Sequence, residues 1–143
     1  MMMKSEIIAE KNNSFFKELS YRYKISFFIL FGSHARSQNN ALSDIDIAYM
    51  PRKKLSLKKE NSLFIEICSF YKRDDIDLVD LTVAPLLLKF SCIMYGKILL
   101  CNDKKTLYNF IVYTRREYLD TEHIRSIFNY YLAKRINEGR FGT

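Results

Sequence analysis

The chain has 143 residues and a mass of 17.0 kDa, which is the size of a single domain. Apolar residues make up 48% and charged residues 27%, a globular composition that excludes long disordered or collagen-like segments. The net charge is +7, from 23 basic and 16 acidic side chains. A moderately basic protein often binds a phosphate-containing ligand or an acidic partner, although solubility alone also accounts for such a charge.

Targeting signals and membrane segments are not recognisable in the sequence. Met1 to Glu6 lack the basic start, apolar stretch and cleavage site of a signal peptide. The longest apolar run, Ile25 to Phe31, is far shorter than the roughly 20 residues of a membrane helix. The cysteines Cys68, Cys92 and Cys101 are odd in number and form no C-x-x-C pair, which favours free thiols over zinc or disulfides. We therefore expect a cytoplasmic protein without membrane association.

The first half of the chain predicts one helix and two strands. Apolar residues at helical spacing predict a helix over Ser5 to Ser20. The continuous apolar run Ile25 to Phe31, followed by glycine, predicts a strand buried on both faces. After a polar loop, strict alternation over Asp44 to Tyr49 predicts a half-buried strand that Pro51 ends.

The central part of the chain continues the alternation of helices and strands. Helical spacing returns from Leu57 to Tyr71, and a third strand follows over Ile76 to Leu81. Pro85 suits the first turn of another helix, and Gly96 suits its C-terminal cap. Lys97 to Cys101 can form a short fourth strand.

The last part of the chain is helical. Asp103 can cap a helix that runs to about Leu119, and a last helix carries an apolar stripe from Ile124 to Ile136. These helices either cover the sheet or dock on a partner helix. The whole pattern predicts an α/β (α+β) fold, a small mixed β-sheet of about four strands packed by helices, in which the first two strands can pair antiparallel. We expect residues 1–101 to form the domain proper and residues 102–143 a C-terminal helical extension of it.

Two short motifs after the first strand are the most informative part of the sequence. They are Phe31-Gly32-Ser33-His34-Ala35-Arg36 and, after residues 37–42, Ser43-Asp44-Ile45-Asp46-Ile47. A glycine at the end of a buried strand lets a ligand approach the backbone closely. Exposed backbone N–H groups at this point, together with the Ser33 hydroxyl, make a natural seat for phosphate.

The paired aspartates predict a metal site. Asp44 and Asp46 are two residues apart on the second strand, so both point to one face with Cα atoms about 6.5 Å apart. Like charges repel unless a cation lies between them, and carboxylate oxygens with substrate phosphates are what Mg²⁺ prefers. A phosphate seat beside such a pair predicts phosphoryl or nucleotidyl transfer by two ions about 3.5–4 Å apart. Asp77 or Asp80 can supply a third carboxylate, and because they lie on opposite faces of a regular strand, alternation alone leaves the choice open.

Together these motifs resemble the signature of the DNA polymerase β-type nucleotidyltransferase superfamily, and the short length is similar to its minimal nucleotidyltransferases. The resemblance covers roughly Ile25 to Cys101 in the order of elements. The third strand, Ile76-Asp77-Leu78-Val79-Asp80-Leu81, further resembles the MNT antitoxins of HEPN–MNT toxin–antitoxin pairs.

Residue roles follow from this resemblance. It implies that Gly32 and Ser33 bind the triphosphate and that Asp44 and Asp46 bind Mg²⁺. It also implies that Asp77, which matches the apolar-Asp-apolar third strand of the family, completes the metal site and helps to deprotonate the incoming hydroxyl.

The resemblance also implies an activity. The MNT antitoxins are thought to transfer AMP from ATP to a tyrosine of the partner HEPN ribonuclease, with pyrophosphate leaving. It therefore implies two Mg²⁺ ions as cofactor, ATP as substrate and a hetero-oligomer with a HEPN toxin. The alternative is a non-catalytic antitoxin of the same fold that neutralises its toxin by binding alone. Direct nucleic-acid binding is not expected, because only the net charge suggests it and no RNA-binding motif is recognisable.

Other charged residues near the motifs allow two interpretations each. Arg36 can contact phosphate or remain solvated in its loop, and His34 is expected to have only a loop role because nothing pairs it with a second catalytic group. The basic stretch Arg52 to Lys59 can hold a triphosphate or an acidic partner, or simply be a solvated connection. Asp74 and Asp75 are expected to form the turn before the third strand.

Overall fold

The computed structural model describes residues 4–32 and 44–139, with side-chain surroundings from residue 12 onward within those ranges. The element boundaries agree closely with those predicted from the sequence. In chain order the elements are α1 (Lys4–Tyr23), β1 (Ile25–Phe31), β2 (Ile45–Pro51), α2 (Leu57–Tyr71), β3 (Ile76–Asp80), α3 (Leu86–Tyr95), β4 (Lys97–Cys101), α4 (Lys104–Asp120) and α5 (Glu122–Asn137).

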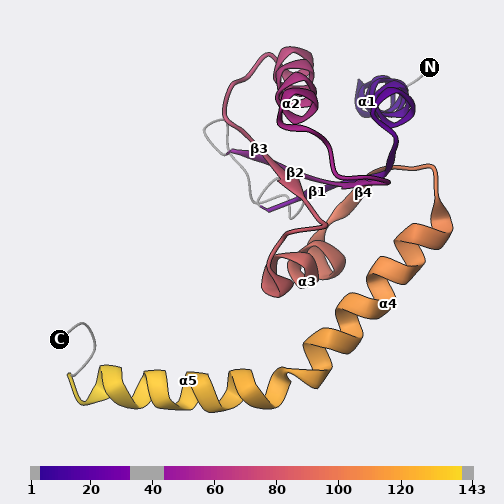
Figure 1. Ribbon diagram of the computed structural model, residues 1–143. Coiled ribbons are helices and arrows are strands. Elements are labelled where there is room, and N and C mark those ends of the chain that lie inside the picture. The colour runs from indigo at the N-terminus through magenta and orange to yellow at the C-terminus, as the bar shows by residue number, and fades with distance from the viewer. Residues whose placement is uncertain (1–3, 33–43, 140–143) are drawn as a thin grey trace.

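The four strands form one mixed sheet in the order β3-β2-β1-β4 (Figure 1). β1 pairs antiparallel with both β2 and β4, whereas β2 pairs parallel with β3 through the crossover helix α2. The predicted mixed sheet of an α/β (α+β) fold is therefore confirmed. The sheet places the end of β1 beside the start of β2 and the start of β3.

Helices cover both faces of this sheet, with α1 and α2 on one side and α3 on the other (Figure 1). Under α1 and α2 the core contains Phe16, Phe28 and Tyr49, and the opposite face packs Ala48 against Cys92 of α3. The expectation that the second strand is only half-buried was wrong. β2 is an interior strand between β1 and β3, and helices cover both faces of the sheet, so most of its residues are buried. Alternating polar residues would still permit one wet face, so the pattern alone could not reveal this.

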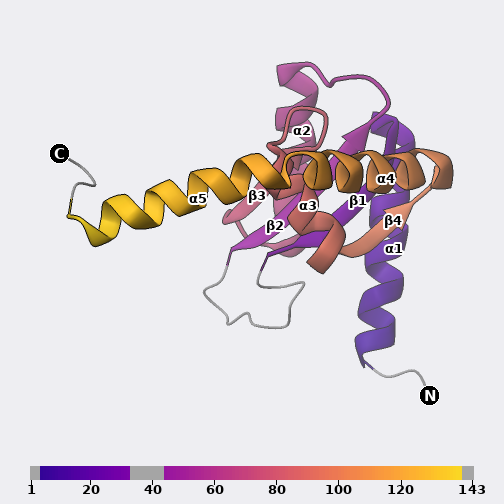
Figure 2. The ribbon, with the colours of Figure 1, turned by 90° about the horizontal axis from the view of Figure 1, so that it is seen from below.

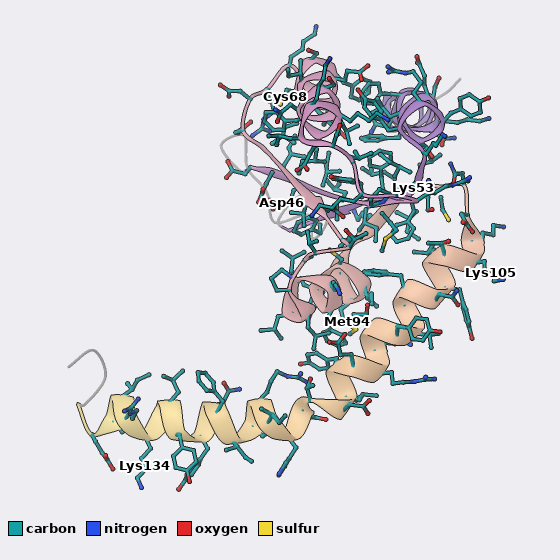
Figure 3. The ribbon with its side chains drawn as sticks, in the orientation of Figure 1. Asp46, Lys53, Cys68, Met94, Lys105 and Lys134 are labelled. Carbon is teal, nitrogen blue, oxygen red and sulfur yellow. The ribbon has the colours of Figure 1, made fainter. Side chains whose placement is uncertain are left out.

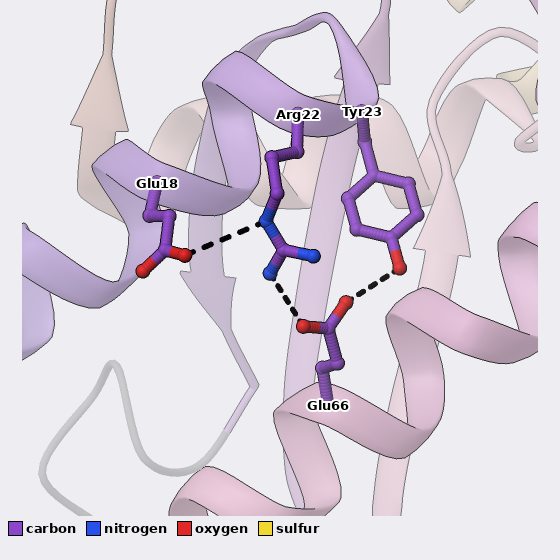
Figure 4. Close-up of polar contacts among 4 residues, drawn as sticks. All are labelled: Glu18, Arg22, Tyr23 and Glu66. Atoms are coloured by element: carbon purple, nitrogen blue, oxygen red, sulfur yellow. Dashed lines mark hydrogen bonds and ion pairs between the residues drawn. The ribbon is translucent and has the colours of Figure 1, made fainter.

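A polar clamp fixes the end of α1 on α2 (Figure 4). The Glu66 carboxylate of α2 accepts hydrogen bonds from the guanidinium of Arg22 and the hydroxyl of Tyr23. Arg22 also lies 3.6 Å from the carboxylate of Glu18, one turn earlier on α1. The clamp therefore positions the turn that leads from α1 into β1.

The two C-terminal helices behave differently. α4 packs on the body, with Phe110 and Thr114 buried, and the rings of Phe90 and Tyr118 stack with centroids 3.6 Å apart. α5 has no buried residue and leads away from the sheet (Figures 1 and 2). Phe128 in its apolar stripe is 63% exposed. Of the two roles expected for the C-terminal helices, α4 covers the domain and α5 does not.

Candidate active site

Gly32 and Asp46 form a tight corner where β1 ends and β2 begins. Gly32 has a φ of +75°, in the left-handed region that favours glycine. A Cβ atom at this position would overlap Oδ2 of Asp46 and lie 3.1 Å from its Cγ. The Asp46 carboxylate therefore lies directly against the backbone of Gly32, and only glycine leaves room for it there.

The register of the sheet aligns a second carboxylate with Asp46. Asp46 pairs with Phe31 of β1 on one side and with Asp77 of β3 on the other. Aligned residues of neighbouring strands lie about 4.8 Å apart and point to the same face. Phe31 belongs to the core cluster beneath α3, so this is the α3 face. Asp44 is exposed just before β2, at the same end of the sheet as the exposed Asp77.

Asp80 lies elsewhere. It aligns with Tyr49, on the face opposite to that of Asp46 and Asp77, and is buried to 7% exposure. One carboxylate oxygen accepts hydrogen bonds from the backbone N–H and the hydroxyl of Thr82, at 2.9 and 2.7 Å. These contacts fix the turn that follows β3, and they place Asp80 away from the Gly32 corner.

The negative charges of Asp46 and Asp44 contribute to the raised pKa values of two neighbouring side chains. Burial, with a smaller contribution from the charge of Asp46, raises the pKa of the Cys92 thiol to about 12. The pKa of Arg73 is raised, first by its hydrogen bond to Asp75 and also by the charge of Asp44. Arg73 Nε donates to Asp75 at 2.7 Å, and the Asp75 carbonyl accepts the Ile45 N–H at 3.2 Å.

Sequence reasoning missed Arg73, although it identified the acidic turn beside it. An arginine next to two aspartates, just before an acidic strand, was the available signal. Arg73 lies close enough to Asp44 for the charge of that carboxylate to contribute to its raised pKa, so it places a positive charge near the start of β2.

The donor atoms fit Mg²⁺ by their chemistry. Within residues 4–32 and 44–139, no three histidine, cysteine or acidic side chains converge closely enough to hold a metal ion. Mg²⁺ typically takes only one or two protein carboxylates, and water and substrate phosphates complete its shell. The Asp46 carboxylate lies against the backbone of Gly32, and the exposed Asp44 and Asp77 lie at the same end of the sheet. Asp44, Asp46 and Asp77 are therefore the residues that would hold the ion.

The remaining predicted residues fall into two groups. Ser33, His34 and Arg36 lie outside the described residues. The basic stretch Arg52 to Lys59 lies at the opposite end of the sheet from Asp46, as the labels of Asp46 and Lys53 in Figure 3 show. Its position does not support the interpretation that it holds the triphosphate at the Gly32 corner.

The fold and this corner are those of a nucleotide-transferring enzyme. The sequence matches the Polymerase beta, Nucleotidyltransferase family over residues 10–105, and the chain belongs to that family. The match spans Gly32, Asp44, Asp46 and Asp77, so the resemblance predicted from the two motifs is confirmed. The curated proteins contain no match to the sequence.

Solved structures narrow the likeness to antitoxins. The chain is 26% identical, with a TM-score of 0.70, to a toxin–antitoxin structure with AMP-PNP, covering 85% of this chain and 98% of that one. It is 25% identical, with a TM-score of 0.65, to the toxin–antitoxin MntA-HepT, covering 86% and 98%. A complex of a tri-AMPylated Shewanella oneidensis HEPN toxin with its MNT antitoxin shares the fold at 24% identity and a TM-score of 0.66, covering 87% and 98%. The predicted resemblance to MNT antitoxins is thereby confirmed.

Within residues 4–32 and 44–139, no helix is both long and apolar enough to cross a membrane.

Proposed function

We propose that the chain is a Mg²⁺-dependent nucleotidyltransferase that transfers AMP from ATP to a tyrosine of a partner HEPN toxin and so acts as its antitoxin. Membership of the nucleotidyltransferase family supports the reaction class. A similar chain occurs in a structure with AMP-PNP, and another occurs with a tri-AMPylated HEPN toxin. The observation that carries the proposal is the corner in which Gly32 packs against Asp46, with Asp77 aligned beside it.

Each residue of the corner has a role in this reaction. Gly32 lets the triphosphate approach the backbone, and Asp44, Asp46 and Asp77 would hold Mg²⁺. Bound Mg²⁺ neutralises the charge that develops on the phosphate oxygens. Asp77 accepts the proton of the tyrosine hydroxyl as its oxygen bonds to the α-phosphorus and the bond to pyrophosphate breaks. Ser33 and Arg36 are the further residues that we assign to the triphosphate.

The same proposal extends to the organisation of the protein. Residues 1–101 would form the minimal transferase domain, residues 102–143 its helical extension, and the active assembly would be a hetero-oligomer with the toxin. A tyrosine acceptor supplied by the partner suits a site whose Asp44 and Asp77 are exposed rather than enclosed. Two Mg²⁺ ions and a cytoplasmic location stay predictions from the sequence.

A labelling experiment tests the proposal. The full chain is incubated with α-labelled ATP, Mg²⁺ and the HEPN protein encoded by the adjacent gene, and label on the partner is followed with time. The same assay is run on Asp44→Ala, Asp46→Ala and the matched control Asp74→Ala, which removes an exposed aspartate from the turn before β3. We expect label that disappears in the first two variants and persists in the control.

The outcomes separate catalysis from binding. Absence of label in the wild type, with toxicity still suppressed by Asp44→Ala and Asp46→Ala, would replace the enzyme by a contact-only antitoxin. Label that survives both substitutions would place the transfer site elsewhere in the chain.

A further inference from the structure

A second charged site lies at the far end of the sheet from the Gly32 corner. A cavity of about 470 Å³ lies beside the connection between β2 and α2. We call it the basic pocket, because cations dominate its lining of Tyr23, Lys24, Arg52, Lys53, Lys54, Leu55, Ser56 and Lys59. Its volume falls within the range of small-ligand sites, roughly 300–1,000 Å³.

The fold brings these cations together from two segments that are distant in sequence. Lys24 occupies the turn between α1 and β1 with a φ of 56°, an unusual backbone conformation for a residue with a side chain. Its carbonyl accepts the N–H of Arg52 at 2.9 Å, and Ile25 pairs with Pro51 in the sheet. The pocket is therefore anchored to the paired ends of β1 and β2.

The start of α2 adds to the positive potential. Ser56 is the N-cap of this 15-residue helix, and its hydroxyl oxygen accepts the Lys59 N–H at 3.2 Å. The N–H groups of the preceding positions in the first turn have no acceptor within the helix, and the helix dipole is positive at this end. The helix therefore reinforces the basic pocket rather than neutralising it.

Few acidic groups balance this charge. Glu66 is engaged by Arg22 and Tyr23, and Glu60 lies in the first turn of α2. Asp103 caps α4 through Thr106 and also responds to the charge of Arg52, so that its pKa is lowered. None of the ion pairs within the described ranges includes a cation of the basic pocket. Five positive charges around one cavity repel each other unless an anion lies between them.

The basic pocket is separate from the candidate active site. Asp46 lies near the start of β2 and Pro51 at its end, five residues or about 17 Å away along a strand. Figure 3 shows Asp46 and Lys53 at these opposite ends. One nucleotide bound with its phosphates at Gly32 would not place the same phosphates in the basic pocket.

We propose that the basic pocket binds a ligand with several closely spaced phosphate groups. A free polyphosphate chain is the favoured source, because the site is concave and of small-ligand size; the backbone phosphates of a single-stranded nucleic acid carry the same chemistry. An acidic protein surface fits less well, since carboxylates on a helix or strand are more widely spaced than linked phosphates. This site is independent of the nucleotidyl transfer proposed above.

Calorimetric titration of the full chain with inorganic tripolyphosphate tests the proposal. The titration is done in EDTA, to remove metal-dependent binding at the other site. We expect Lys53→Ala/Lys54→Ala to weaken binding roughly tenfold and to lessen its dependence on salt. Lys134→Ala/Arg135→Ala removes the same charge from α5 and should bind as the wild type does. Asp46→Ala should also keep the affinity, because it alters only the other end of the sheet.

Further arms identify the source and check the fold. A labelled 12-nucleotide single-stranded RNA is titrated by fluorescence anisotropy, and thermal melting verifies that each variant is folded. Lys59→Ala serves as a second, single-site variant in the helix. Tripolyphosphate binding lost in the pocket variants supports a free polyphosphate, and RNA binding alone lost in them supports a nucleic-acid backbone.

Three results would overturn the proposal. The first is no binding of either probe, and the second is equal weakening by the pocket variant and the α5 control, which would indicate net charge only. The third is equally tight binding of polyglutamate, which would reassign the pocket to an acidic protein surface.

Discussion

Substituting Gly32 by alanine tests the corner on which the proposed chemistry depends. The new Cβ would overlap Oδ2 of Asp46 and would have to adopt a φ of +75°. The left-handed backbone costs about 1–2 kcal/mol for a residue with a side chain, so we expect a fall in Tm of several degrees, roughly 3 °C per kcal/mol. The carboxylate must move by about 1 Å to relieve the overlap, and such a misplacement reduces catalysis on the order of 10²-fold.

Gly139 provides a matched control for the backbone cost. It has a φ of +69° near the end of α5, and a Cβ there would have nothing within 4 Å. AMP transfer to the partner and thermal melting are measured on Gly32→Ala and Gly139→Ala. Gly139→Ala should retain full activity. If Gly32→Ala kept wild-type transfer, or lost no more activity than its folded fraction, the contact between Gly32 and Asp46 would have no catalytic role.

Three other predictions concern single groups. Asp77→Asn should lower the rate of AMP transfer by roughly 10²–10⁴-fold with little change in Tm. Asp80→Asn should keep the AMP transfer rate, because asparagine retains the side-chain oxygen that accepts the Thr82 N–H. The reverse result would make Asp80 the third carboxylate. The raised pKa of Cys92, about 12, keeps its thiol protonated, so iodoacetamide near neutral pH should label it in urea but not in the native protein, as mass spectrometry would reveal. Burial raises the pKa of Glu66, but the bonds from its two partners on α1 outweigh this and lower it. The stabilising contribution of Glu66 is therefore present above the unfolded pKa, about 4.3, and is lost as pH falls through the lower folded pKa. Glu66→Gln should consequently reduce the fall of Tm between neutral and acidic pH. A Tm–pH curve identical to that of the wild type would contradict this.

The elements of the fold could be predicted because local rules govern them. The strand Ile25–Phe31 and the helix Leu57–Tyr71 have the predicted bounds, since an apolar run and a helical stripe each fix their own limits. Gly96 is the C-cap of α3 as expected, whereas Pro85, predicted to lie in the first turn, is the N-cap residue before it. Local patterns could also place Asp46 near the start of a strand, although the strand begins at Ile45 and Asp44, predicted to lie on it, precedes it.

Features that depend on pairing between distant segments could not be predicted. Alternation could not choose between Asp77 and Asp80, and it is the parallel register of β2 with β3 that aligns Asp77 with Asp46. The contact of Gly32 with Asp46 likewise needs the pairing of β1 with β2. Lys24 joins the basic pocket only because the turn after α1 meets the end of β2.

The alignment of the carboxylates Asp46 and Asp77 depends on the correct parallel pairing of β2 with β3. A slip of one residue would turn Asp77 toward the opposite face and exchange it with Leu78, which packs against the α1–α2 side of the core. Such a chain would bury a charge, lose an apolar contact and separate the two carboxylates at once. Misregistered molecules would thus be eliminated by their own instability, and the surviving native population would contain few inert copies.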